Sequence, residues 1–375
     1  MSDRGFLTPR VLVIGSQSLP DTLEWHVIDS LRFMQCPHEL FDVRMGLGGY
    51  GPRLAAAADK ITHTLLREPE RLVEKPLLRK VAEFQPELVL VILGNRLSPK
   101  TVARLRTVTQ APIVCWCQDQ MTTLGRQFLL GSGYDAVFLK DRYMQDLFSR
   151  MIRSTQFHYL AESCNPRVHR TVKLETADRE RLQCDVMIAA SLYYYRQEIL
   201  QQLGEFDLKV WGARPDWLLY RLAVRHQGGE VVMNEKAKAM QAACICLNTL
   251  HYAEVNGLNC RAFEIAGCGG FQLITAVPVL SEHFQPGVEL ASFDSVDTLL
   301  EQIRHYLRNP EAATSIAARG QARAHAEHTY EHRLQEIFRI CLAGSGQRMR
   351  LGNRTPAAVT GAAAPIAVEP ESLGS

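Results

Sequence analysis

Two charged residues in the last third of the chain have a spacing that could bind a phosphorylated ligand. They are Arg261 and Glu264, in the segment GLNCRAFEIAGCGGFQLIT at 257–275. Residues three apart lie on the same side of a helix. Free N–H groups at a helix N-terminus attract phosphate, and an arginine in the first turn adds a full positive charge. The Glu264 carboxylate could accept two hydrogen bonds from a vicinal diol such as ribose.

The glycines of this segment suit the same interpretation. Gly257 lets the chain turn tightly and lets a ligand approach the backbone, while Gly269 and Gly270 end a helix. The segment therefore predicts a helix over 259–268 with a nucleoside diphosphate at its N-terminus. Spacing alone leaves a plain helix ion pair between Arg261 and Glu264, which contributes about 0.2–0.5 kcal/mol, as the alternative.

Alternating apolar runs and helical patterns upstream must position this segment. Strand-like runs lie at 11–15, 87–93, 112–117, 135–140 and 157–161, and after a polar stretch near 161–183 they restart at 185–190, 206–212, 244–250, 271–275 and 288–293. Strands that alternate with helices are typical of a parallel, doubly wound sheet. We therefore expect an α/β protein with two Rossmann-like domains, 1–170 and 171–341. Ligands in such sheets bind beyond the carboxyl ends of the strands, here in a cleft between the domains.

The chain after about residue 342 has a different composition. It is rich in Ala, Gly and Pro and has no periodicity, so a disordered tail is predicted over 342–375. Its Arg348, Arg350 and Arg354 would allow a peripheral contact with anionic lipid. Acidic residues follow them, and a solvated tail is the preferred interpretation.

Composition and charge exclude several classes of protein. The 42 basic and 40 acidic residues give a net charge of +2, which argues against nucleic-acid binding. The N-terminus has no secretory signal, and the longest apolar run, at 88–93, is too short for a transmembrane segment. The ten cysteines form no CxxC pair and no zinc-like spacing. We expect a cytoplasmic protein without a metal site.

Residues 241–340 resemble the C-terminal half of the CgeB-type (spore maturation protein) glycosyltransferases, relatives of the group-1 GT-B enzymes. The resemblance rests on ICLNTLHY, the segment 257–275, FQPGVEL, YLRNPE and IAARGQARAHAEHTYEHR, in that order. Upstream, AASLYYYR at 189–196 is similar to the family's turn before an arginine. The first half is similar more loosely, through VLVIG, WCQDQ, YDAVFLKD and YLAESCNPRVH.

This resemblance implies a GT-B-like fold whose C-terminal helix returns to the first domain. It implies transfer of a hexosyl or related sugar from a nucleotide-diphosphate-sugar donor, without a metal and with no cofactor beyond this co-substrate. Arg196 would lie near the diphosphate and Glu264 would bind the ribose. Asn256 stands where group-1 enzymes carry the first of two glutamates; CgeB-type proteins commonly lack that acid, and the amide could bind a sugar hydroxyl. The donor-site candidates are Arg196, Gly212, Asn248, Asn256, Gly257, Arg261 and Glu264.

Some of the candidate site residues could have a structural role instead. Arg196 could be a solvated helix arginine, and Asn248, expected at a strand end facing the cleft, could be a capping residue. Gly212 ends a strand where bare backbone would leave room for the nucleotide. Asp119 follows a strand, where a catalytic base or an acceptor-binding carboxylate would lie, or it could cap a loop.

The stretch GLGGYG at 46–51 matches a dinucleotide-binding pattern. It does not follow the first strand, so NAD binding is not expected, and a flexible glycine loop facing the cleft is preferred.

Three functions remain compatible with the sequence. A glycosyltransferase is preferred, and its acceptor could be a glycan, a protein or a small molecule. Another nucleotide-sugar enzyme, such as an epimerase or a phosphorylase, is the second. A catalytically inactive binding or scaffold protein is the third, and Asn256 in place of a glutamate is its support.

Overall fold

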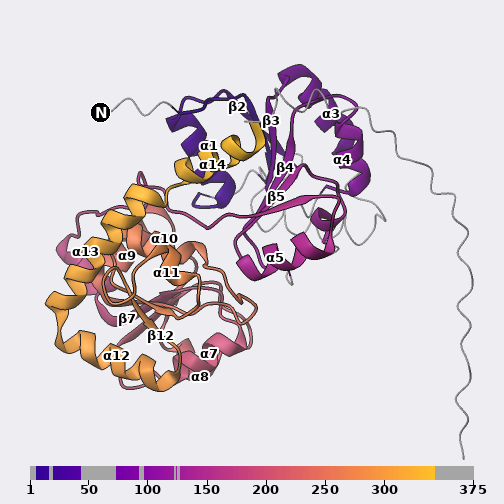
Figure 1. The fold of residues 1–375 in the computed structure, drawn as a ribbon. Helices are drawn as coiled ribbons and strands as arrows, with labels where there is room; N and C mark the ends of the chain where they lie inside the picture. The colour runs from indigo at the N-terminus through magenta and orange to yellow at the C-terminus, as the bar shows by residue number, and fades with distance from the viewer. Residues whose placement is uncertain are drawn as a thin grey trace, which may run out of the picture.

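Two parallel six-stranded sheets form the cores of two domains (Figure 1). The computed structural model describes residues 6–16, 20–43, 73–92, 97–121, 124 and 127–342. The strands of the first domain are β1 (Val11–Gly15), β2 (His38–Asp42), β3 (Leu88–Ile92), β4 (Ile113–Cys117), β5 (Ala136–Leu139) and β6 (Gln156–Tyr159). Those of the second are β7 (Cys184–Ala189), β8 (Leu208–Trp211), β9 (His226–Gly228), β10 (Ala243–Asn248), β11 (Gln272–Thr275) and β12 (Ala291–Phe293).

The strand order is β2-β1-β3-β4-β5-β6 in the first sheet and β12-β11-β10-β7-β8-β9 in the second. Every described pairing is parallel. The carboxyl ends of neighbouring strands therefore meet at one edge of each sheet, which is where doubly wound proteins place their ligands.

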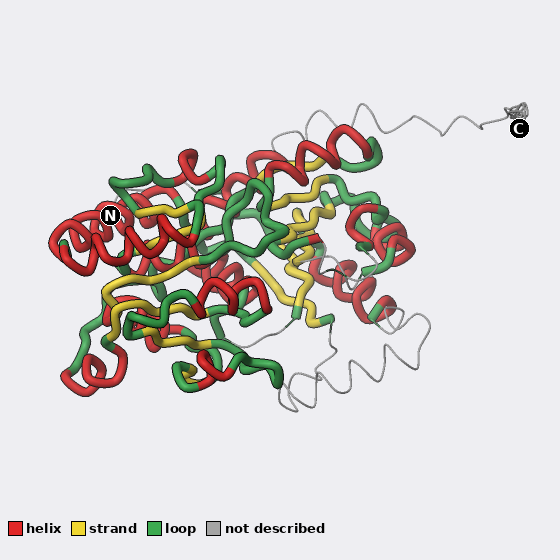
Figure 2. The backbone as a smooth tube through the Cα atoms, turned by 90° about the horizontal axis from the view of Figure 1, so that it is seen from below, coloured by secondary structure: helices red, strands yellow, loops and turns green. Residues whose placement is uncertain are grey.

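Helices connect the strands and cover the sheets. In the first domain they are α1 (Leu23–Phe33), α3 (Glu74–Phe84), α4 (Pro99–Leu105), the 3-10 helix η4 (Phe128–Leu130) and α5 (Arg142–Met151). In the second they are α6 (Thr176–Leu182), α7 (Tyr194–Gln201), α8 (Tyr220–Ala223), α9 (Met233–Ala242), α10 (Cys260–Cys268), α11 (Leu280–His283), α12 (Val296–Arg308) and α13 (Pro310–Glu327), followed by α14 (Tyr330–Leu342). In Figure 2 the strands lie between surrounding helices. No helix of the described residues has both the length and the apolar character needed to cross a membrane.

The central strands are apolar along their whole length because both faces of the sheet are covered. All five residues of β1 are buried. Successive side chains point to opposite faces, so Val13 packs in a core with Leu334 of α14. Its neighbour Ile14 packs in a second core with Leu77 of α3.

The last helix, α14, belongs to the first domain although it follows the second in sequence. Tyr330, Leu334 and Phe338 join the core formed by β1 and α1, and Figure 1 shows α14 beside α1. The predicted return of the C-terminal helix is thus confirmed, as is the α/β fold with two parallel sheets.

The sequence-based elements differ from the structure in a few places. No element was expected between residues 226 and 243, where β9 and α9 form. The strand expected at 288–293 is reduced to Ala291–Phe293, because the chain turns at Gly287, whose φ is +80° and whose N–H donates to Leu290 O. The GLGGYG stretch and the tail from 343 lie outside the described residues.

Candidate functional site

Two asparagines build the N-terminus of α10: Asn248, the last residue of β10, and Asn259, the residue before the helix. Asn259 caps the helix by accepting a hydrogen bond from Ala262 N. Asn248 Nδ2 donates to Asn259 Oδ1, and Asn259 Nδ2 donates to Asn248 Oδ1, both at 2.9 Å. Asn248 is fully buried. It therefore positions the start of the helix. The sequence had led us to expect this side chain at the surface of a cleft, but the structure buries it.

Arg261, in the first turn of α10, points toward the carboxyl end of β7. Its Nε donates to Asn248 Oδ1 at 3.3 Å and its Nη1 donates to Ala189 O at 2.9 Å. Both acceptors are neutral oxygens, so the guanidinium makes no salt bridge among the described residues, although its charge acts on the Glu254 carboxylate nearby.

Arg196 brings a second guanidinium to the same place from α7. Its Nε and Nη2 donate to the hydroxyl and the carbonyl of Thr249, each at 2.7 Å, and its Nη1 donates to Ser191 O. Burial lowers the pKa of Arg196 to about 9, and the charge of Arg261 adds to that effect. Among the described residues neither arginine pairs with a carboxylate. Two neighbouring cations whose hydrogen-bond acceptors are all neutral are suited to bind an anion, although the Glu254 carboxylate lies near enough to act on both charges.

Gly212 lies beside this site at the end of β8, but packing explains the glycine. Its φ is +141°, and a Cβ there would lie 2.1 Å from Ala190 O. The Gly212 carbonyl also accepts a hydrogen bond from His226 Nε2 at 2.9 Å. The bare backbone thus allows β8 to approach the end of β7 closely.

Asn256 and Gly257 contact the first domain. A Cβ on Gly257 would lie 2.8 Å from Lys140 O. Asn256 N donates to Asp141 Oδ2 at 3.1 Å, and its side-chain oxygen accepts from Val279 N at 2.8 Å. The absence of a side chain at Gly257 therefore lets the backbone of the first domain approach closely. We had expected it to let a ligand approach.

Lys140 reinforces the same contact. Its ammonium lies 2.5 Å from Glu254 Oε1, and both side chains are nearly buried. Next to it, Arg142 N donates to Asn256 O at 3.0 Å. A loop of the second domain is thereby held against the carboxyl end of β5.

The carboxyl edge of the first sheet carries two carboxyl groups near this contact. Asp119, which follows β4, is exposed. Glu162, which follows β6, is 3% exposed, and its Oε2 has no hydrogen-bond partner in the described structure. Burial raises the pKa of Glu162 well above its usual range, although Lys140 opposes this. The sequence analysis missed Glu162, whose only signal is its place directly after a strand.

Glu264 does not pair with Arg261. Its Oε2 lies 3.1 Å from the ammonium of Lys236 on α9. That ammonium also lies 2.8 Å from Oδ2 of Asp21, in the loop before α1 of the first domain. Burial would raise the pKa of Glu264, but the charge of Lys236, aided by other nearby groups, outweighs it and the pKa is lowered. The ion pair between Arg261 and Glu264, which the sequence analysis kept as an alternative, is therefore absent from the described part of the chain.

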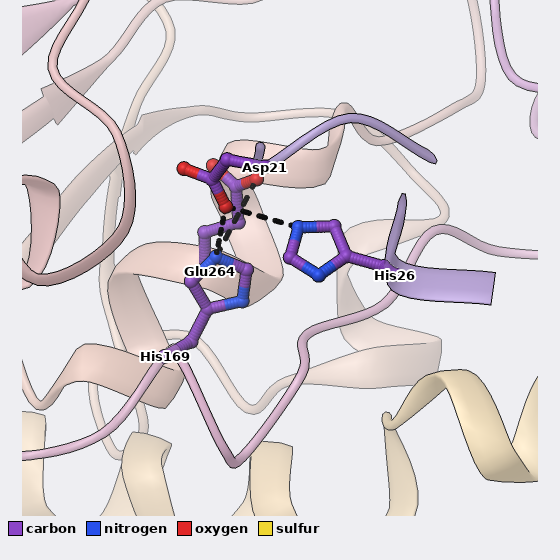
Figure 3. A group of neighbouring side chains, drawn as sticks. All are labelled: Asp21, His26, His169 and Glu264. Carbon is purple, nitrogen blue, oxygen red and sulfur yellow. Dashed lines mark hydrogen bonds and ion pairs between the residues drawn. The ribbon is translucent and has the colours of Figure 1, made fainter. Parts of the chain in front are cut away.

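Asp21 is the acceptor on which several donors converge. His26 Nε2 lies 3.0 Å from Asp21 Oδ1, and Met233 N donates to Oδ2 at 3.0 Å. His169 Nε2 lies 3.3 Å from Asp21 Oδ1 and 3.8 Å from Glu264 Oε1 (Figure 3). Burial acts to raise the pKa of Asp21, but these histidines and Lys236 hold it well below its usual range.

Asp21, His26, His169 and Glu264 offer ligand atoms that all lie within 4.8 Å of one another. Two imidazoles and two carboxylates are a donor set that suits a divalent transition metal. The Lys236 ammonium, however, already bridges the two carboxylates. The two carboxylates therefore have a cationic partner on the side of Asp21 Oδ2 and Glu264 Oε2.

Hydrogen bonds also set the protons of both rings. Asn165 N donates to His169 Nδ1 at 3.0 Å. Asn165 Nδ2 donates to Asp29 Oδ2 at 2.8 Å, which fixes the amide orientation, and lies 3.3 Å from His26 Nδ1. Since each Nδ1 accepts, a neutral ring carries its proton on Nε2. His26 Nε2 bonds to Asp21 Oδ1 at 3.0 Å, whereas His169 Nε2, 3.3 Å from the same oxygen, has no hydrogen bond of good geometry among the described residues. A metal ligand must present a bare nitrogen there, so these rings are arranged as donors.

Comparison with known proteins agrees with this arrangement. Residues 196–339, just over a third of the chain, match the model of a family described as glycosyl transferase-like. No curated protein matches the sequence. Sucrose-phosphate synthase from Thermosynechococcus elongatus superposes with a TM-score of 0.66 at 12% identity, over 90% of this chain and 100% of that one. Anabaena HepE (Alr3699), solved with UDP and glucose, gives 0.59 at 14% identity, over 88% and 99%. A glycosyltransferase from Rickettsia africae gives 0.62 at 11%, over 92% and 100%.

The superpositions show that the chain has the GT-B fold of glycosyltransferases. With the glycosyl transferase-like match across the second domain, the chain is a glycosyltransferase.

Proposed function

We propose that this enzyme transfers a sugar from a nucleoside-diphosphate-sugar donor, bound by the second domain, to an acceptor bound at the carboxyl edge of the first sheet. The observation that carries the proposal is the pair of guanidiniums of Arg196 and Arg261 beside the N-terminus of α10. Their hydrogen-bond acceptors are neutral, so a diphosphate would be the anion that balances them. A helix N-terminus adds free N–H groups at that position.

Glu264 is proposed to bind the donor ribose. Lys236 contacts Oε2, and the 3.8 Å between Oε1 and His169 Nε2 is too long for a hydrogen bond. Oε1 therefore retains acceptor capacity for a ribose hydroxyl. The lowered pKa keeps the group ionised, as acceptance from a diol requires.

A uridine nucleotide is the proposed donor. The support is the superposition with HepE, whose structures contain UDP with glucose and UDP-glucose. The transferred sugar is proposed to be a hexose on the same ground.

Asp119 is proposed to bind the acceptor or to act as its base. Its exposure after β4 leaves the carboxylate open to a substrate. In the reaction, the acceptor oxygen forms a bond to the anomeric carbon, and the bond from that carbon to the diphosphate oxygen breaks. The acceptor proton passes to the Asp119 carboxylate, and the two arginines stabilise the charge on the leaving diphosphate.

A metal ion is not needed in this proposal. Arginines and helix N–H groups stabilise the leaving group, and the Lys236 ammonium already bridges Asp21 Oδ2 and Glu264 Oε2. We also retain the nearer kinship with the CgeB-type enzymes as a proposal, on the motifs of 245–333. None of the ten cysteines, all of which lie in the described part of the chain, forms a disulfide, which supports a reducing, cytoplasmic setting.

A scaffold protein without turnover is the second candidate. Asn256, in place of a glutamate, has its side-chain oxygen bonded to Val279 N, so it brings no charge to the donor sugar. Such a protein would bind nucleotide but transfer nothing.

Calorimetry and thermal-shift measurements with UDP, GDP, TDP, ADP and their sugars, with and without EDTA, test the proposal. We expect UDP to bind regardless of EDTA and UDP-glucose to be hydrolysed or transferred slowly. If no nucleoside diphosphate binds, the proposal fails. If one binds and no donor sugar turns over with any acceptor class, the scaffold candidate replaces it.

A further inference from the structure

Lys236 connects the two domains through a single ammonium group. It lies 2.8 Å from Asp21 Oδ2 in the first domain and 3.1 Å from Glu264 Oε2 in the second. Its side chain is only 11% exposed. Burial would lower the pKa of Lys236, but the two carboxylates outweigh it and raise the pKa. The ammonium is therefore charged and shared.

The two carboxylates depend on Lys236 to different degrees. Asp21 also lies within hydrogen-bond distance of His26 Nε2 and Met233 N, both at 3.0 Å. Among the described residues, Glu264 has one ion-pair partner within hydrogen-bond distance, and that partner is Lys236. His169 Nε2 is 3.8 Å from Glu264 Oε1, which is too far for a hydrogen bond. Loss of the ammonium would thus leave Glu264 without an orienting donor, whereas Asp21 would keep two.

We infer that Lys236 is a positioning residue that orients Glu264 for the donor ribose and, through Asp21, couples donor binding to closure of the two domains. The inference rests on the proposed function, because it takes Glu264 as the group that binds ribose. Asp21 holds Lys236 only while the domains are in contact. The closed enzyme therefore binds the donor more tightly than the open one, and by the same factor the donor favours closure.

Four variants separate these roles, with UDP as the probe. Lys236→Met removes both the orientation of Glu264 and the link between domains, so UDP affinity falls at least tenfold. Asp21→Asn removes only the charge that ties Lys236 to the first domain, so affinity falls by about the coupling factor, roughly fivefold. In the double variant the loss equals that of Lys236→Met alone, because Asp21 acts through Lys236. Lys236→Arg retains the charge and stays within threefold of the wild type.

Lys238→Met is the matched control. Lys238 lies two residues away on α9, and its partners Asp178 and Glu235 belong to the second domain. This variant should bind UDP like the wild type. Thermal unfolding establishes that each variant is folded. If Lys236→Met alone does not fold, the double variant, which removes one charge of each sign, is compared with Asp21→Asn instead and should bind UDP more weakly than that single variant.

Small-angle scattering supplies a readout that a purely structural role would not move. With UDP bound, the wild type and Lys238→Met should have the smaller radius of gyration, and Asp21→Asn at saturating UDP should have the larger one. Unchanged affinity in Lys236→Met, or additive losses in the double variant, overturns the inference while the proposed function stands. Absence of UDP binding by the wild type overturns both.

Discussion

Arg261 and Glu264 lie one helical turn apart on α10 but contact different elements. Arg261 donates to the end of β7 at Ala189 O, and Glu264 pairs with Lys236 toward the first domain. The pair thus separates a cationic site for phosphate from an anionic site for a diol. Such separation is what end-on binding of a nucleoside diphosphate requires.

Removal of either side chain should weaken UDP binding and leave the fold intact. A hydrogen bond to a charged group contributes about 1.5–3 kcal/mol, so Arg261→Ala and Glu264→Ala should each raise the Kd for UDP roughly 10- to 150-fold. Calorimetry measures the affinity, with Arg304→Ala, an exposed arginine paired with Glu205, as the control. Normal UDP binding by both site variants would show that the donor site lies elsewhere.

Gly257→Ala should disturb the contact between the domains. Its Cβ would meet Lys140 O at 2.8 Å, a backbone atom that cannot rotate away. We expect turnover to fall at least tenfold while UDP affinity changes much less, because the arginine site lies within the second domain. Gly229→Ala is the control, since a Cβ there meets nothing within 4 Å. Equal turnover in the two variants would mean that the domains tolerate a shift at this point.

Local signals explain what the sequence could predict of this site. Asn259 begins α10 as its cap, and Gly269, with a φ of +75°, ends it in the left-handed conformation that glycine favours. The same kind of reasoning identified β1, β3 and β4 from continuous apolar runs. These elements were predicted because their cause lies within a few residues.

Contacts between distant segments explain what was missed. Lys236 lies on a helix, α9, that the sequence did not indicate, and its partners come from the first loop of the chain and from α10. The need for glycine at 257 was evident, but the sequence could not tell whether a ligand or Lys140 approaches it. Asn248 was expected in a cleft and instead holds Asn259, because both amides are buried together.

Metal removal should leave the enzyme unchanged. Lys236 already gives both carboxylates a cation at Asp21 Oδ2 and Glu264 Oε2, and each imidazole accepts a hydrogen bond at Nδ1, so neither ring offers a bare Nε2 in its neutral form. Dialysis against EDTA should alter UDP affinity and turnover by less than twofold. Activity that disappears with EDTA and returns with Mn²⁺ or Zn²⁺ would assign these four residues to a metal instead.

Stability should decrease as pH falls below neutrality, partly through His328. Burial and Arg333 lower the pKa of His328 to about 3, and Arg333 Nη2 donates to its Nδ1 at 2.9 Å. The folded state keeps the ring neutral, while the unfolded state binds a proton below about pH 6.5. The contribution is therefore complete above pH 6.5 and is lost between 6.5 and about 3, at up to about 1.4 kcal/mol per pH unit.

Urea unfolding at pH 7.5 and 5.5 measures this loss. His328→Gln keeps a donor and an acceptor but does not titrate, so its stability should depend less on pH than that of the wild type. His305→Gln, at an exposed position, should leave the dependence unchanged. An identical pH dependence in His328→Gln would contradict the assignment.

Asp119→Asn should separate chemistry from donor binding. The carboxylate lies after β4 in the first domain, and the arginines that hold the diphosphate lie in the second, so the Kd for UDP should change by less than twofold. Loss of a general base lowers kcat by about 10²- to 10⁴-fold. Turnover with saturating UDP-sugar and a responsive acceptor provides the measurement, and Asp146→Asn, exposed on α5, provides the control. A rise in the acceptor KM with unchanged kcat would make Asp119 an acceptor-binding group, and the raised pKa of Glu162 would then make that residue the next candidate for the base.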